Sequence, residues 1–199
     1  IIKLFIMFKT IEISDHQLVP KYSLDWAKAC VSDGKDLNYL FFWGHTNNAP
    51  RLTKVCFSQW WRCGFEVDGR IYNCAEQYMM AEKARIFGDM KILQAILQET
   101  DQKTIKGLGR KVRNFDEAIW DKLKYAVVIK GNYHKFSQNK NMRDFLLKTE
   151  DAVIVEASPY DRIWGIGLKE SDLDAQDPFS WRGKNLLGFA LMEVRDELR

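Results

Sequence analysis

The feature that most constrains the fold is a long run of helix-forming sequence after residue 73. Apolar residues recur there at helical spacing, and glycines, prolines or capping residues separate one segment from the next. Helices are expected near residues 74–88, 90–99, 101–107, 115–136, 138–148 and 186–198, with a short strand over Ala152–Val155. The chain is therefore predicted to be mainly α with a small β element.

Before residue 73 the signals are mixed. A short amphipathic helix is expected near Ser23–Val31, and an apolar strand over Asn38–Trp43 stops at Gly44. The segment Phe65–Tyr72 predicts a β-hairpin, because its central Asp-Gly pair supplies the positive φ values of a two-residue turn.

Composition excludes several classes of protein. The chain has 199 residues, of which 46% are hydrophobic and 29% charged, so disorder, a collagen-like repeat and a membrane bundle are ruled out. The net charge of +3 is too small for a protein that coats a long duplex. This charge is uneven, since Lys103–Lys148 carries +8 and Glu150–Asp177 carries −6. The aromatic fraction of 13% includes seven tryptophans, and it raises the question of ring stacking on a ligand.

Cysteine usage and the N-terminus indicate the compartment. The four cysteines form no C-x-x-C pair and the three histidines fall at no ligand spacing, so no metal site and buried free thiols are expected. The apolar start, Ile1–Phe8, is too short for a membrane span or a signal sequence. A start on isoleucine suggests a trimmed or partial chain. A cytoplasmic protein with no membrane association is expected.

The helix predicted over Cys74–Gly88 carries two charges on its apolar face. On a helical wheel Glu76 and Lys83 lie about 20° apart, and neither has an oppositely charged residue three or four positions away. A capping box in which Glu76 binds the Asn73 amide would explain the glutamate, and a lysine stem that reaches water would explain Lys83. Together they favour one groove in which a carboxylate and an amine perform acid–base or covalent chemistry.

Two further local patterns concern the ends and outer face of the helices. The opposite side of the Cys74–Gly88 helix is expected to carry surface ion pairs of Arg85 with Glu82 and with Asp89. A second capping box, Asn114 with Glu117, is expected to start the helix over residues 115–136.

Three other segments suit ligand binding. Gly107–Lys111 combines two glycines with two cations, as a phosphate site or simply a basic helix end. Pro159–Gly167 places an acid, an aromatic ring and glycines after a strand, as a site loop or a tight turn with Trp164 buried. Trp181–Asn185 offers polar donors before the last helix, unless Asn185 is merely its N-cap.

The segment Asn73–Arg85, with the sequence NCAEQYMMAEKAR, resembles the signature helix of the NADAR (YbiA-like) family. The other matching segments follow in order: Phe41–Gly44, Phe57–Trp60, Gly107–Arg110, Phe115–Trp120, Lys135–Phe136, Leu146–Leu147, Val155–Gly165 and Gly183–Arg195. The resemblance spans residues 39–197 and divides the chain into an N-terminal extension over 1–38, with a short helix, and a catalytic domain over 39–199.

This resemblance implies a mainly helical single domain that hydrolyses the ribosyl C1′–N bond of a nucleotide without cofactor or metal. One associated substrate is ADP-ribose attached to guanine, in nucleic acid or as a free base adduct. The other is a phosphoribosyl-aminopyrimidine intermediate of riboflavin synthesis. The implied partners are an ADP-ribose-type nucleotide and an ADP-ribosylated nucleic acid.

The resemblance also assigns roles to residues of this sequence. Glu76, Lys83 and Asp161 match catalytic positions: an acid–base, an amine able to form a Schiff base, and a carboxylate for ribose hydroxyls or a second acid. The substrate-binding residues it implies are Phe42, Trp43, Gly44, Arg110, Trp164, Gly165, Lys184 and Asn185. Among these, Phe42 and Trp164 are expected to stack on a ring, and Arg110 and Lys184 to meet phosphates.

The residues also allow two functions that are not enzymatic. A non-catalytic ADP-ribose-binding module would use the same pocket without needing Lys83. A nucleic-acid binder would depend on the basic Lys103–Lys148 segment and would show a steep salt dependence.

Overall fold

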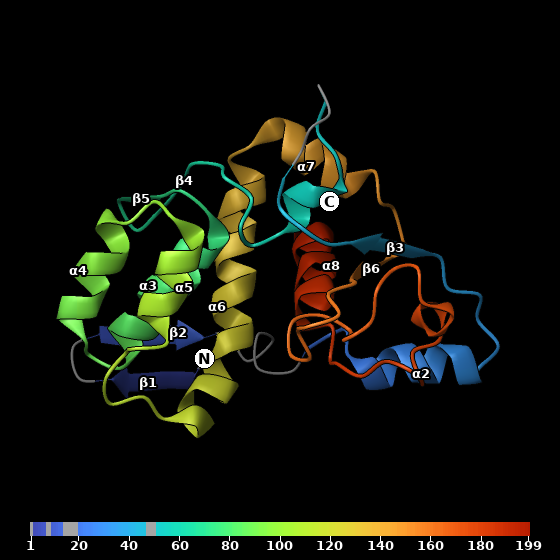
Figure 1. Cartoon of the computed structure of the whole chain (residues 1–199), viewed down its shortest axis with the longest axis horizontal. Coiled ribbons are helices and arrows are strands. Elements are labelled where there is room, and N and C mark those ends of the chain that lie inside the picture. The colour runs from blue at the N-terminus through green and yellow to red at the C-terminus, as the bar shows by residue number, and fades with distance from the viewer. Residues whose placement is uncertain (1, 7–8, 14–19, 47–50) are drawn as a thin grey trace. The chain divides into compact units, whose positions relative to one another are not determined.

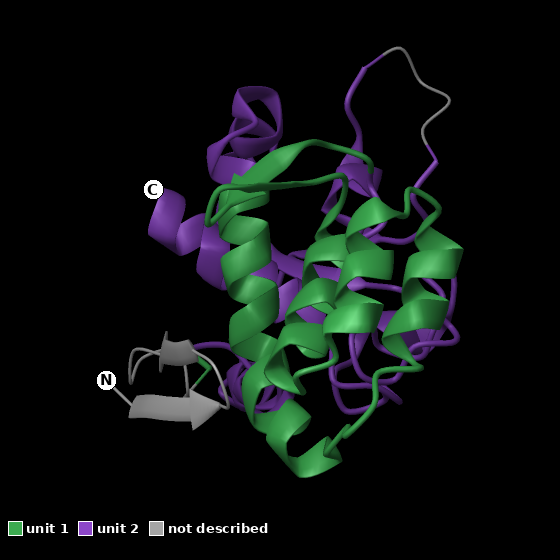
Figure 2. Cartoon of the chain, turned by 90° about the vertical axis from the view of Figure 1, so that its left-hand side faces the viewer, with its two compact units in different colours: residues 1–20, 62–135 green, residues 21–61, 136–199 purple. Residues whose placement is uncertain are grey.

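The computed structural model describes residues 2–6, 9–13, 20–46 and 51–199, with side chains from residue 20 onward (Figure 1). The chain clusters into two compact units (Figure 2). The first unit comprises residues 1–20 and 62–135, and the second comprises residues 21–61 and 136–199. The expectation of a mainly helical protein with a small β element is confirmed.

The first unit is built around one buried helix, α3 (Ala75–Ile86), which packs against α4 (Met90–Gln98) and α5 (Gln102–Gly109) (Figure 1). The predicted hairpin precedes α3 as β4 (Phe65–Val67) and β5 (Arg70–Tyr72). Its turn residues Asp68 and Gly69 have φ values of 52° and 74°, as the Asp-Gly pair requires. The remaining elements of this unit are the antiparallel strands β1 (Ile2–Ile6) and β2 (Lys9–Ile13), and α6 (Glu117–Ser137) up to residue 135.

Close packing in the first unit explains one of the two glycines in the segment Gly107–Lys111. The helix expected over residues 101–107 is two residues longer at its end, because α5 continues to Gly109. A Cβ on Gly109 would lie 2.0 Å from the sulfur of Met80, so glycine is what lets α5 approach α3 this closely. Gly109 therefore serves helix packing, whereas a Cβ on Gly107 would meet nothing within 4 Å.

The second unit contains the parallel pair β3 (Tyr39–Phe42) and β6 (Val153–Glu156), with Tyr39 opposite Val153. The last helix, α8 (Leu186–Leu198), packs on β6, where a Cβ on Gly188 would lie 2.0 Å from the Ile154 carbonyl oxygen. The other elements are α2 (Leu24–Ser32), α7 (Lys140–Leu147) and the short 3-10 turns η1 (Lys54–Phe57) and η2 (Leu173–Gln176).

Within the described ranges, no helix combines the length and apolar character needed to cross a membrane. The four cysteines carry free thiols, as expected: Cys30, Cys56 and Cys74 are buried and Cys63 is half-buried.

Candidate active site

The start of α3 differs from the predicted capping box. The N-cap is Cys74, and the side chain that reaches back to the Asn73 amide is that of Gln77, at 2.8 Å, not that of Glu76. The amide group of Gln77 also donates to the carbonyls of Ile96 and Glu99 at the end of α4, both at 2.9 Å. The capping explanation for Glu76 is therefore wrong.

Glu76 is a buried carboxylate on α3, with only 3% of its surface exposed. Because α3 is continuous from residue 75 to 86, Lys83 lies on the same face two turns later, about 10.5 Å along the axis. Lysine side chains of a helix lean toward its N-terminus, and this direction brings the Lys83 amine toward the Glu76 end. The carboxylate of Glu76 and the amine of Lys83 therefore belong to the same face of α3.

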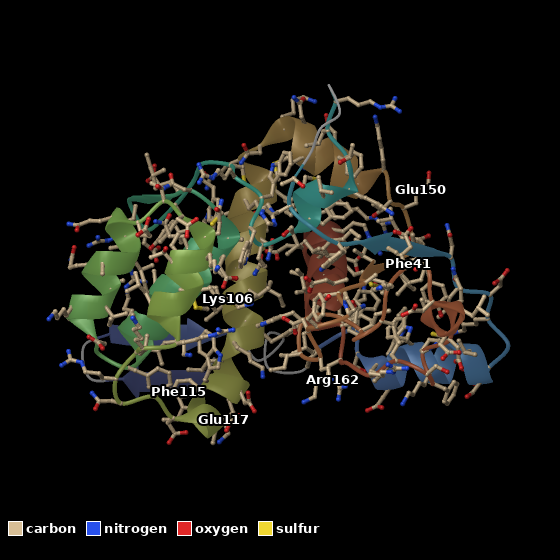
Figure 3. The ribbon with its side chains drawn as sticks, in the orientation of Figure 1. Phe41, Lys106, Phe115, Glu117, Glu150 and Arg162 are labelled. Atoms are coloured by element: carbon tan, nitrogen blue, oxygen red, sulfur yellow. The ribbon has the colours of Figure 1, made fainter. Side chains whose placement is uncertain are left out.

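The Lys83 amine is held between two aromatic rings of the first unit. Its Nζ lies 4.0 Å from the centroid of Phe115 and 5.7 Å from that of Trp120. Phe115, labelled in Figure 3, is fixed in turn by an edge contact with Phe87 at 5.2 Å between centroids. In the part of the chain that the structure describes, no carboxylate forms an ion pair with Lys83.

This environment favours the neutral amine. Burial lowers the pKa of Lys83 from its usual value, and the positive charge of Arg110 lowers it further. More of the lysine is then unprotonated at neutral pH than in water, which is the form that attacks a carbon centre. The thiol of Cys74, at the N-cap of α3, is not activated in this way, because burial raises its pKa to about 11 and keeps it protonated.

A buried carboxylate anchors the segment that carries Phe115. Asp89 is 1% exposed, and its oxygens accept from the Arg113 backbone and Nε, both at 3.0 Å, and from Nη2 at 2.9 Å. The same carboxylate caps α4 by accepting from the Ile92 amide at 3.2 Å. The predicted surface pair of Asp89 with Arg85 is therefore wrong, whereas Arg85 does pair with Glu82.

The start of α6 is also capped differently from the prediction. Asp116, not Asn114, supplies the capping oxygen, which accepts from the Ile119 amide at 3.0 Å. Asn114 instead adopts a left-handed φ of 56° in the turn between Arg113 and Phe115.

Loss of the Asp89 charge is expected to weaken the fold. Asp89→Asn should lower the free energy of unfolding by about 2 kcal/mol at pH 7, because hydrogen bonds of Arg113 to a charged acceptor are lost. The pKa of Asp89 is held well below its usual range by Arg113, so its stabilisation is complete above about pH 4 and is lost as the pH falls below that.

Urea unfolding at pH 7 and pH 3.5 measures both effects, and the difference between wild type and Asp89→Asn should shrink at the lower pH. Asp144→Asn, which removes an exposed carboxylate paired with Lys140, is the matched control. An equal loss in the two variants would contradict the anchoring role of Asp89.

Arg110 lies at the end of α5 as its C-cap and is exposed. Its guanidinium is close enough to Lys83 to act on that amine electrostatically. Of the predicted site residues, Glu76, Lys83 and Arg110 therefore belong to the first unit, and the charge of Arg110 acts on the Lys83 amine.

The other predicted residues belong to the second unit. Asp161 forms a tight turn in which its Oδ1 accepts from the amides of Ile163 and Trp164, both at 2.8 Å. Trp164 is half-buried, and Gly165 is tightly enclosed, since a Cβ there would lie 2.7 Å from the Glu156 carbonyl oxygen.

Asn185 is the N-cap of α8, yet its side chain makes no capping bond. Its backbone is left-handed, with φ at 51°, and its side chain binds β6: Nδ2 donates to the Ile154 carbonyl and Oδ1 accepts from the Glu156 amide, both at 2.9 Å. The Asn185 side chain thus pairs with two backbone groups of β6. The adjacent Lys184 is exposed, and its amide donates to the Arg162 carbonyl at 3.0 Å.

The segment Phe42–Gly44 contributes one buried and one exposed ring. Phe42 is fully buried, and its ring packs at a steep angle against that of Phe57, with 5.6 Å between the ring centroids. Neither face of the Phe42 ring is open to solvent in this structure. Trp43 is 53% exposed and lies 6.3 Å from the ring of Tyr160. Gly44, with φ at 81°, follows at the strand end.

Comparison with known proteins identifies the family of this chain. The family model described as "NADAR domain" matches residues 41–199. The chain belongs to the NADAR family. N-glycosidase R617 of Acanthamoeba polyphaga mimivirus is 46% identical over 80% of this chain and 95% of its own length. N-glycosidase YbiA of Escherichia coli is 30% identical over 71% of this chain and 80% of its own length.

The fold of this NADAR protein is similar to that of a solved relative. An NMR structure of E. coli YbiA superposes with a TM-score of 0.64 at 26% identity, covering 82% of this chain and 87% of that one. Protein irg-1 of Caenorhabditis elegans is 43% identical over 64% of this chain and 61% of its own length.

Two contributions to the site in the first unit were not predicted from the sequence: the aromatic contacts of Phe115 and Trp120 with Lys83, and the anchor at Asp89. Phe115 and Trp120 lie in a matching family segment, but nothing local to that segment points to a lysine more than thirty residues earlier. The signal that could have found them was the unexplained Lys83, which needed a neighbour other than a carboxylate.

Proposed function

We propose that this protein is an N-glycosidase that hydrolyses the C1′–N bond between ADP-ribose and guanine without a cofactor. Residues 39–199 would form the catalytic domain and residues 1–38 an extension. The observation that carries the proposal is the half-buried Lys83 amine, held 4.0 Å from Phe115 on the same face of α3 as the buried Glu76. The N-glycosidase names of the relatives support the class of reaction.

The proposed reaction begins at the base. Glu76 donates a proton to the guanine, and the C1′–N bond breaks with its electron pair going to the base. The neutral Lys83 amine forms a new bond to C1′. The sugar ring then opens, its oxygen takes the proton that the Lys83 nitrogen releases, and a protonated Schiff base results.

Water completes the cycle. It adds to C1′, gives one proton to the Glu76 carboxylate and leaves its oxygen on C1′. The bond between C1′ and the Lys83 nitrogen breaks as the proton of the new hydroxyl passes to that nitrogen, which returns ADP-ribose and the free amine. Asp161, whose Oδ1 is occupied by two amides, would use Oδ2 to accept from a ribose hydroxyl.

The role of Arg110 gives a pH-dependent prediction. Arg110→Gln should raise the pKa of Lys83 toward its ordinary value, because a nearby positive charge that disfavours the ammonium form is removed. The pH midpoint for borohydride trapping of a small uncharged aldehyde on Lys83, followed by peptide mapping, should therefore rise, and it should rise less at high salt. Arg110→Lys keeps the charge and should keep the wild-type midpoint, and an unchanged midpoint in Arg110→Gln would contradict the interaction.

Two substrates test the proposed function. The protein is incubated with an oligonucleotide carrying ADP-ribose on guanine and, separately, with the phosphoribosyl-aminopyrimidine intermediate of riboflavin synthesis. Chromatography should show free ADP-ribose and restored guanine in the first reaction and no base release in the second. Cleavage of the second substrate alone would overturn the substrate class. Binding of ADP-ribose without cleavage of either would overturn the enzymatic proposal in favour of a binding module.

A further inference from the structure

The β4–β5 hairpin of the first unit, which leads into α3 (Figure 1), brings two cysteines opposite each other. Its strands pair with Phe65 opposite Tyr72, and the chains stay adjacent past the strand ends, where the Cys63 amide donates to the Asn73 carbonyl at 3.0 Å. Counted on from this register, Cys63 comes opposite Cys74. Residues that face each other across two antiparallel strands have Cβ atoms about 4.5–5.5 Å apart.

The same two cysteines belong to the buried face of the hairpin. Phe65 and Tyr72 are buried, and their rings stack with 6.0 Å between centroids. The next residue outward on each side is exposed, and the one after it is again covered: Cys63 is half-buried and Cys74 is 1% exposed. This alternation is the period of two of extended chain, so both thiols lie on the face of the stacked rings. The Cys63 thiol also acts electrostatically on that of Cys74.

Cys63 can be reached by a small molecule. It lines a cavity of about 330 Å³ together with Arg62, Gly64, Asn73 and Thr100, all in the first unit. Cys74 does not line this cavity and lies at the N-cap of α3. A small oxidant would therefore meet the Cys63 sulfur first.

Burial sets the acidity of both thiols. It raises the pKa of Cys63 and raises that of Cys74 to about 11, whereas the positive charge of Lys135 acts in the opposite direction on both. Each thiol is therefore oxidised more slowly at neutral pH than an exposed cysteine. A disulfide carries no charge, so burial does not oppose this product.

We propose that Cys63 and Cys74 are a modification site, at which a peroxide produces a reversible disulfide. The Cys63 sulfur attacks one peroxide oxygen, the O–O bond breaks, and a sulfenic acid and one water result. The Cys74 sulfur then attacks the Cys63 sulfur, and the sulfenic hydroxyl leaves with the Cys74 proton as a second water. The two thiols lose two electrons and two protons, and one peroxide is reduced to two waters.

The disulfide would act on Glu76, and this consequence rests on the proposed function. Cβ atoms joined through a disulfide lie about 3.5–4.5 Å apart, roughly 1 Å closer than those of facing residues on two strands. Glu76 lies in the first turn of α3, two residues after Cys74, and its charge acts on the Cys74 thiol. Closing the bond would draw this turn toward the hairpin and move the carboxylate out of its catalytic position.

Peptide mapping without a reductant tests the bond. Reduced protein is treated with hydrogen peroxide, and the remaining thiols are blocked with N-ethylmaleimide. Trypsin cuts after Arg62, Arg70 and Lys83, which puts the two cysteines on separate peptides. Residues 63–70 and 71–83 should be recovered as one linked species that has lost two hydrogen atoms, and dithiothreitol should separate them.

Two variants control the mapping. Cys63→Ser should abolish the linked species, whereas Cys30→Ala, which removes a buried cysteine of the second unit, should retain it. Urea unfolding shows whether each variant is folded. The proposal is overturned if the two peptides of peroxide-treated wild type stay separate, or if electrophoresis without reductant shows that the bond joins two chains.

Turnover distinguishes this proposal from the proposed function. Oxidation of the wild type should slow base release about tenfold or more, and dithiothreitol should restore the rate. Cys63→Ser should keep its rate in peroxide, which separates the disulfide from oxidation of methionines. Full turnover by the linked protein, or an equal loss in Cys63→Ser, would overturn the effect on Glu76. Reduced protein that forms the bond but never releases base would overturn only the proposed function.

Discussion

Replacement of Lys83 by methionine is expected to reduce base release at least a hundredfold, to roughly the rate that acid–base catalysis alone supports. Methionine has a similar length and can pack beside Met79, Met80 and Phe115, so the fold should be retained. What it lacks is the nitrogen that forms the bond to C1′. The rate is measured under saturating substrate, so that any change in affinity is separated from the loss of chemistry.

Lys83→Arg is the matched control for charge. A guanidinium keeps the positive charge and the contact with the aromatic rings, yet it stays protonated and cannot attack carbon. This variant should therefore be as inactive as Lys83→Met. Near-normal turnover in Lys83→Arg would show that position 83 supplies only a cation, and the covalent step would be rejected.

Replacement of Glu76 by glutamine is expected to lower the rate of base release by about 10²- to 10⁴-fold, the range for loss of a general acid. Glutamine has nearly the same shape as glutamate, so it should fit the same space at this position, which is 3% exposed. Substrate affinity should change much less than the rate, because the proton is transferred in the transition state.

The control for Glu76 lies on the same helix. Glu82→Gln removes a carboxylate that pairs with Arg85 on the side of α3 away from Lys83. Its turnover should stay within a few-fold of wild type. If Glu76→Gln retained comparable activity, another residue would have to protonate the base.

Much of the fold could be predicted because its signals are local. The helices over residues 74–88 and 186–198 follow from apolar spacing, and the Asp68-Gly69 turn follows from the backbone conformation that only a few residues adopt easily. These features depend on residues within a few positions of one another. The structure therefore reproduces them with differences of one or two residues at their ends.

The predictions were wrong where residues far apart in the sequence determine the contacts of a side chain. Gln77 replaces Glu76 at the start of α3 because the carbonyls of Ile96 and Glu99, at the end of α4, also bind its amide. Asp89 leaves the surface because Arg113, twenty-four residues later, encloses its carboxylate. No pattern within one helix contains this information.

The candidate site shows the same division. The wheel of one helix was enough to single out Glu76 and Lys83, because their spacing is a property of that helix. The contacts of Lys83 with Phe115 and Trp120 join two segments of the first unit, and only the folded unit brings them together. These contacts replace the carboxylate partner that the sequence did not offer.

The most direct test of the covalent account is the mass of the protein after turnover in the presence of borohydride. With ADP-ribosylated guanine as substrate, reduction of the Schiff base should add one ADP-ribose unit through a stable C1′–N bond, and peptide mapping should place it on Lys83. Turnover that continues with no adduct, or an adduct mapped to another lysine and retained in Lys83→Met, would contradict the account.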